Sequence, residues 1–182
     1  MEASDAEEDP IALVVIIAAF LVIVAIQPSE FRVERTTTVA APSDAVFAQV
    51  NDLHKWEAWS PWAKLDPAAK ATFEGPDAGQ GAAMGWSGNE KVGEGKMTIV
   101  ESHPNDDIKI KVDFTKPFEG LIGSEFAFKP DGDKTDVTWA MTGHRSFVQK
   151  AFCLVMNGDK MLAGDLEKGL AQLKSVAEQG KS

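Results

Sequence analysis

The stretch SFVQKAFCLVMNGDKMLAGDLEKGLAQLKSVAEQ, residues 146–179, decides the fold, because it is the longest part of the chain beyond residue 30 whose pattern is typical of helix alone. Ser146 and Gln149 have the spacing of a capping box, in which each side chain bonds the other residue's backbone amide, so a helix should begin here. Apolar residues then recur three, four or seven positions apart: Val155, Leu162, Leu166, Leu170, Leu173 and Ala177. This spacing predicts that one face of the helix is buried.

The sequence Asn157-Gly158-Asp159 interrupts this helical pattern. A glycine inside a helix costs about 1 kcal/mol relative to alanine, so we expect a kink here or two helices in tandem. The apolar residues Phe147, Phe152, Met156 and Met161 lie around the break. They are either ordinary core or the lining of a cavity, because methionine also packs around irregular space.

Short segments with alternating apolar and polar residues precede this helix. Strands are expected over residues 31–39, 72–74, 82–87, 95–101, 108–115, 124–129 and 136–142. Turn-forming sequences such as Pro130-Asp131-Gly132-Asp133 separate them, which indicates antiparallel hairpins. The alternation predicts a sheet with one packed face and one face in water.

A short helix is expected after the first strand, from Pro42 or Ser43 to Val50, and three of the five tryptophans follow within residues 56–62. The order of elements predicts an α+β fold. A sheet with one apolar face must cover it, and only the C-terminal helix is long enough, so a curved antiparallel sheet should wrap around that helix. A lipocalin-like barrel is the alternative, but it would need neither the long helix nor the early helical insertion.

Four sequence segments carry a resemblance to a known family: residues 31–35 (FRVER), 40–47 (AAPSDAVF), 50–53 (VNDL) and 56–62 (WEAWSPW). They are similar to the SRPBCC superfamily, the START-like, helix-grip family of polyketide cyclases/dehydrases, lipid carriers and related ligand binders. Residues 137–139 (VTW) and the long terminal helix agree with it. The resemblance covers residues 31–179. It is closest to bacterial members with one N-terminal membrane segment, and it implies a helix-grip fold.

The resemblance also implies a cavity for a hydrophobic small molecule or lipid between the sheet and the last helix. Such a pocket needs apolar walls, and the alternating segments and the terminal helix offer these candidates: Trp59, Phe73, Met84, Trp86, Met97, Ile110, Phe114, Phe126, Trp139, Met141, Phe152 and Met156. The family has no single catalytic set, so the resemblance assigns no catalytic residue.

An enzyme of the cyclase or dehydratase type is the alternative function. It would need a polar group buried in the pocket with a perturbed pKa. Candidates for acid–base chemistry are Asp52, His54, Glu57, His144 and Arg145. Their simpler interpretation is structural, with Asp52 as a local cap and the others as solvated charges. A regulator that binds a partner protein with the outer face is a third possibility.

Several functions find no support in the sequence. The three histidines are scattered and the only cysteine is Cys153, so we expect neither a metal site nor a disulfide, and we expect Cys153 to be buried. The sequence lacks a nucleophile elbow, a phosphate-binding loop and a dinucleotide fingerprint, so no cofactor is expected. The net charge of −10 argues against a nucleic-acid binder, which needs clustered bases. We expect a monomer.

The N-terminal part differs from the rest of the chain. Residues 1–10 hold five acids and no base, and residues 11–26 are an unbroken apolar run between Pro10 and Pro28. We expect an acidic tail over residues 1–10, a transmembrane anchor over residues 11–27 and a ligand-binding domain over residues 28–182. Sixteen residues span about 24 Å of a hydrocarbon core about 30 Å thick, which is barely enough.

A cleaved signal peptide is the alternative for this segment, but no Lys or Arg precedes it and no small-x-small cleavage pattern follows. Arg32 and Arg35 follow the segment, and the positive-inside rule then favours a cytoplasmic domain. The basic residues that often precede this segment in similar proteins are replaced here by acids. We therefore expect a single-pass protein of a bacterial cell membrane, without assigning the side of the domain.

Overall fold

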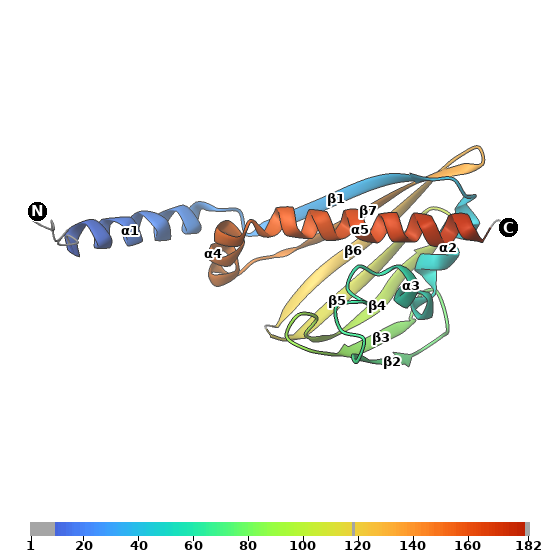
Figure 1. Cartoon of the computed structure of the whole chain (residues 1–182), viewed down its shortest axis with the longest axis horizontal. Coiled ribbons are helices and arrows are strands. Elements are labelled where there is room, and N and C mark those ends of the chain that lie inside the picture. Colours follow the sequence, from blue (N-terminus) through green and yellow to red (C-terminus); the bar gives the residue numbers. More distant parts are fainter. Residues whose placement is uncertain (1–9, 118, 181–182) are drawn as a thin grey trace, which may run out of the picture.

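One seven-stranded antiparallel sheet organises the chain (Figure 1). The computed structural model describes residues 10–117 and 119–180. The strands are β1 Glu30–Val39, β2 Lys70–Glu74, β3 Ala83–Ser87, β4 Glu94–His103, β5 Asp107–Lys116, β6 Gly120–Asp131 and β7 Lys134–His144. Their order across the sheet is β1-β7-β6-β5-β4-β3-β2, so the first strand pairs with the last and the others form a meander. Each predicted strand forms; β3 begins one residue later than predicted, and the other six extend beyond their predicted bounds.

Helices cover the inner face of this sheet. Between β1 and β2 the chain forms α2 Ser43–Asn51, the 3-10 turn η1 Leu53–Lys55 and α3 Trp56–Trp59. The C-terminal helix α5, Gly158–Gln179, runs along β1 and also contacts α2 and α3 (Figure 1). This arrangement confirms the predicted α+β, helix-grip fold.

The helical stretch that decides the fold is two helices in tandem, as one of the two alternatives predicted. Ser146 Oγ accepts a hydrogen bond from the Gln149 amide at 3.4 Å, and Gln149 Oε1 accepts one from the Ser146 amide at 2.8 Å, so the capping box forms. The first helix, α4 Phe147–Met156, ends at Asn157, whose left-handed backbone (φ 54°) turns the chain into α5. Cys153 in α4 is only half-buried, which corrects its expected burial.

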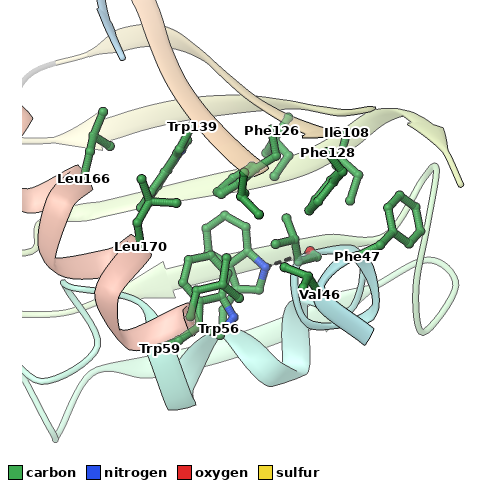
Figure 2. Packing of buried hydrophobic residues seen from close by; sticks show 14 of the residues in the cluster. Val46, Phe47, Trp56, Trp59, Ile108, Phe126, Phe128, Trp139, Leu166 and Leu170 are labelled. Carbon is green, nitrogen blue, oxygen red and sulfur yellow. Dashed lines mark hydrogen bonds between the residues drawn. The ribbon is translucent and has the colours of Figure 1, made fainter. Parts of the chain in front are cut away.

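The core between sheet and helices is centred on an aromatic cluster of Trp56, Trp59, Phe126 and Trp139 (Figure 2). Phe126 and Trp139 stack with ring centroids 4.8 Å apart, and Trp59 meets both rings edge-on. Trp139 Nε1 donates to Ser124 Oγ at 2.9 Å, which satisfies two buried polar groups at once. α5 reaches this cluster because Gly169 has no side chain: a Cβ there would lie 2.5 Å from Trp139 Cζ3.

The N-terminal apolar run forms a helix, α1 Pro10–Ile26, that extends away from the domain (Figure 1). Its 17 residues correspond to about 25 Å at the helical rise, which is short of the roughly 30 Å hydrocarbon core. Among residues 10–117 and 119–180, no helix has both the length and the apolar character needed to cross a membrane. The predicted transmembrane helix is therefore not supported. Residues 1–9 of the predicted acidic tail lie outside the described residues.

Candidate functional site

The strand register sorts the inner face of the sheet into rows, because residues paired across antiparallel strands point to the same side. Two rows form the sealed part of the face: Val33-Met141-Ser124-Ile110-Ile99 and Arg35-Trp139-Phe126-Ile108. Two further rows, which we name the open rows, lie toward the end of the sheet where β1 begins and β7 ends: Phe31-Gly143-Ile122-Val112-Met97-Met84-Phe73 and Gly120-Phe114-Gly95-Trp86-Ala71.

Burial differs between these two parts, except that Val112 in an open row is buried (6% exposed) and Arg35 at the edge of a sealed row is half-buried. Trp139, Phe126 and Ile108 in the sealed rows are 0% exposed. In the open rows Met84, Trp86, Met97 and Phe114 are only half-buried, although they pack against the core. Apolar side chains that keep one side free form a surface suited to an apolar ligand. The open rows are therefore the candidate functional site.

Local geometry keeps the aromatic side chains of the open rows in place. Trp86 Nε1 donates to the Val92 carbonyl at 3.0 Å, which anchors the polar edge of the indole. The Trp86 and Phe114 rings meet edge-on with centroids 5.4 Å apart. Gly95 lies between them on β4, and a Cβ there would lie 2.6 Å from the indole ring. Gly95 thus lets the two aromatic residues meet across a strand.

The predicted lining residues fall into three groups. Phe73, Met84, Trp86, Met97 and Phe114 lie in the open rows. Trp59, Ile110, Phe126, Trp139 and Met141 are buried, and Trp59, Phe126 and Trp139 belong to the aromatic cluster. Phe152 and Met156 are 61% and 48% exposed on α4, which packs against α1 and α5. Rings thus fill the centre of the predicted cavity.

Five half-buried residues beside the same core were not among the predicted lining residues: Phe31, Ile122, Trp62, Leu162 and Val176. Phe31 and Ile122 belong to an open row, and the guanidinium of Arg145 lies 4.2 Å from the centre of the Phe31 ring. Alternation within each strand places both residues on the apolar face. Only the pairing between strands, however, shows that they share a row with Met97.

The surface also has two hollows, and most of the residues that line them lie outside the open rows. The first has a volume of about 100 Å³ and is lined by Leu53, His54, Phe73, Glu74, Gly75, Pro76, Asp77, Ala82 and Ala83. The second has a volume of about 280 Å³ and lies mainly on the outer face, where Gly123 leaves space between Lys111 and Thr142. Its remaining lining residues are Val100, Lys109, Ile110, Leu121, Ile122, Ser124 and Glu125.

The acid–base candidates separate into local pairs. Asp52 caps η1 by accepting from the His54 amide at 3.0 Å, and its carboxylate also lies 3.0 Å from His54 Nδ1. The His54 ring stacks on Phe73 beside the smaller hollow, with centroids 4.0 Å apart. At the end of β7, His144 pairs with Glu30 and Arg145 with Asp159. The fifth candidate, Glu57, is exposed on α3.

One group of potential metal ligands lies on β4 and β5, where ligand atoms of Glu101, His103 and Asp107 are within 4.8 Å of one another. Each of these groups already has a polar partner. His103 Nδ1 lies 2.8 Å from Asp107, and Lys109 Nζ donates to Glu101 at 2.6 Å. This hydrogen bond raises the pKa of Lys109. The arrangement is that of a surface hydrogen bond beside a surface ion pair.

The architecture and the apolar inner face define an α+β helix-grip domain. Residues 30–178 match the family described as polyketide cyclase/dehydrase and lipid transport, and the chain belongs to this family. A comparison with curated protein sequences finds no match.

Solved structures share the fold. A protein from Thermus thermophilus is 14% identical, with a TM-score of 0.61 over 84% of this chain and 100% of that one. A protein from Mesorhizobium loti is 15% identical, with a TM-score of 0.58 over 82% of this chain and 98% of that one. A protein from the dynemicin biosynthetic locus is 15% identical, with a TM-score of 0.56 over 82% of this chain and 48% of that one.

Proposed function

We propose that the domain binds a hydrophobic small molecule or lipid against the open rows, and that α1 attaches it to a membrane. The observation that carries the proposal is the change in burial along the inner face. The sealed rows are closed by the aromatic cluster, whereas Met84, Trp86, Met97 and Phe114 keep accessible apolar surface. Aromatic rings and flexible methionines suit apolar ligands of irregular shape. The family's association with lipid transport supports the same proposal.

The attachment to a membrane rests on α1. Ten of its large apolar side chains are exposed, at fractions from 45% to 74%: Ile11, Leu13, Val14, Val15, Ile16, Ile17, Leu21, Val22, Ile23 and Ile26. A helix that is apolar all round is suited to an apolar medium rather than to water. We infer that α1 inserts into the lipid of a bacterial cell membrane.

The test is ligand binding by the full chain, extracted in a mild detergent. We expect an apolar compound to co-purify and to be detected by mass spectrometry, and a fluorescent fatty acid to compete with it. Met97→Glu places a charge in an open row and should weaken fatty-acid binding by at least tenfold. Lys111→Glu on the outer face is the matched control. No bound compound, or equal binding by the two variants when circular dichroism shows both folded, would refute the proposal.

A cyclase- or dehydratase-type enzyme is the second candidate, and one observation favours it: Asp52 and His54 form a hydrogen-bonded pair beside the smaller hollow. In such an enzyme the imidazole would move a proton and the carboxylate would orient it. Loss of a measured turnover in His54→Gln, with fatty-acid binding retained, would support the enzyme. Unchanged turnover in this variant would exclude His54 as the group that moves the proton, and absence of turnover in the unsubstituted protein would argue for binding alone.

A further inference from the structure

We propose that α4 is a second membrane-contacting element, whose apolar side chains lie in the surface of the lipid bilayer that holds α1. This inference rests on the membrane attachment proposed above. The lipid bilayer would then cover the apolar side chains that α4 exposes at the surface of the domain.

The composition of α4 is unusual for a helix at a protein surface. Apart from Cys153, its only polar residues are Gln149 and Lys150. Both make hydrogen bonds within the protein: Gln149 forms the capping box, and Lys150 bonds to carbonyls at the end of α1. The large apolar side chains are exposed instead: Phe147 45%, Val148 69%, Phe152 61%, Leu154 42%, Val155 67% and Met156 48%. Met161, in the first turn of α5, is 55% exposed as well. Contiguous apolar surface of this kind marks an interaction site.

Contacts with α1 fix the position of α4. Lys150 Nζ donates to the carbonyl oxygens of Ala25 at 3.2 Å and Gln27 at 3.1 Å, at the end of α1 where carbonyls lack helical partners. Val24 is 0% exposed, and the Arg145 amide donates to the Ser29 carbonyl at 2.7 Å. α4 therefore lies at the domain end of α1, which is the level where an inserted α1 would leave the lipid (Figure 1).

The position of α4 beside α1 indicates which medium covers the apolar surface of α4. Val14, Val15, Ile16 and Ile17 are consecutive residues that point about 100° apart, and each is at least 50% exposed. A groove on a protein partner covers one stripe of a helix, whereas lipid surrounds the whole circumference. The medium that covers α1 thus reaches the exposed side chains of α4 beside it. A helix at this level lies in the interface and places its apolar side chains among the lipids.

The test uses the full chain in vesicles of phosphatidylcholine and phosphatidylglycerol (3:1). In a Cys153→Ser background, single cysteines replace Val148 or Val155 on α4, Lys168 on α5 as the exposed control, and Val15 on α1. Each cysteine carries an environment-sensitive fluorophore. Nitroxide groups on the lipid chains quench fluorophores in the bilayer, and iodide quenches those in water. We expect the α4 positions to be quenched by lipid nitroxide at least threefold more than position 168, with blue-shifted emission.

The outcomes separate this inference from the proposed attachment. Lipid quenching at position 15 with iodide quenching on α4 would overturn the role of α4 and leave the attachment intact. Iodide quenching at position 15 as well would overturn both. Blue-shifted emission on α4 without lipid quenching, lost on dilution of the protein in the vesicles, would show that a second copy covers the helix and would also overturn the inference.

Discussion

The contact between α5 and the aromatic cluster predicts that the same substitution has opposite effects at two positions of one helix. Gly164 and Gly169 both lie inside α5. A Cβ at Gly164 meets no atom within 4 Å, whereas a Cβ at Gly169 would lie 2.5 Å from Trp139 Cζ3 and 3.0 Å from Pro61 Cδ. Gly164→Ala should therefore stabilise the protein, and Gly169→Ala should not.

The magnitudes follow from two terms. Replacing a helical glycine by alanine gains about 0.8–1 kcal/mol at either position. Carbon atoms pack at about 3.5–4.0 Å, so the Cβ at position 169 requires α5 and Trp139 to separate by roughly 1 Å. Such overpacking costs about 1–3 kcal/mol. We expect Gly164→Ala to be more stable by about 1 kcal/mol and Gly169→Ala to be less stable by up to about 2 kcal/mol.

Equilibrium urea unfolding of the full chain in detergent, followed by circular dichroism and tryptophan fluorescence, measures both free energies. In thermal scans 1 kcal/mol corresponds to about 2–4 °C for proteins of this size, so the two variants should differ by several degrees. Equal stabilisation of the two variants would show that α5 does not approach Trp139 as closely as described. Unchanged stability of Gly164→Ala would show that helix propensity does not set the gain.

Two further predictions concern the sheet and the helix α5 that packs on it. Trp139→Ala and Leu166→Ala should each lower the free energy of unfolding by about 2–5 kcal/mol, because both residues are 0% exposed, while Lys111→Ala should change it by about 0.5 kcal/mol or less; a small loss at both buried positions in urea titrations would contradict the core assignment. The Lys116 ammonium lowers the pKa of Glu94 through a hydrogen bond of 3.0 Å, so Lys116→Met should raise that pKa toward its ordinary value in an NMR titration. Because the folded-state pKa is lowered, this pair stabilises the protein at neutral pH and the effect is lost as the pH falls through that pKa; an unchanged Glu94 pKa would refute the assignment.

Local patterns predicted the architecture because the features that determine it are short-range. The capping box, the break at Asn157 and the strand alternation each involve neighbouring residues. They appear in the structure at the predicted positions. Pairing of β1 with β7 was not predicted, because residues roughly 100 positions apart make that contact. The same limit applies to the site: alternation places Met97 and Ile122 on the inner face, but only the register places them in one row.

Burial along the inner face could not be predicted either. Phe126 and Phe114 occupy equivalent positions in alternating strands, yet Phe126 is 0% exposed while Phe114 is half-buried. The difference arises because α3 and α5 converge on Trp139 and carry Trp59 into contact with Phe126. Where the helices converge depends on Gly169, whose role is visible only once the packing partner is known.

The apolar residues of α4 show why hydrophobicity in a sequence does not identify the medium that covers it. Phe152 and Met156 are apolar residues of the kind that usually line the buried face of a helix. In most proteins such a helix face is buried against the sheet. Here Lys150 holds α4 to the end of α1 instead. The open rows lie at this same end of the sheet, since a Cβ at Gly120 would come within 4.0 Å of Gln149 Nε2 on α4. A bilayer in contact with α4 would therefore lie at the same end of the sheet as the proposed binding surface.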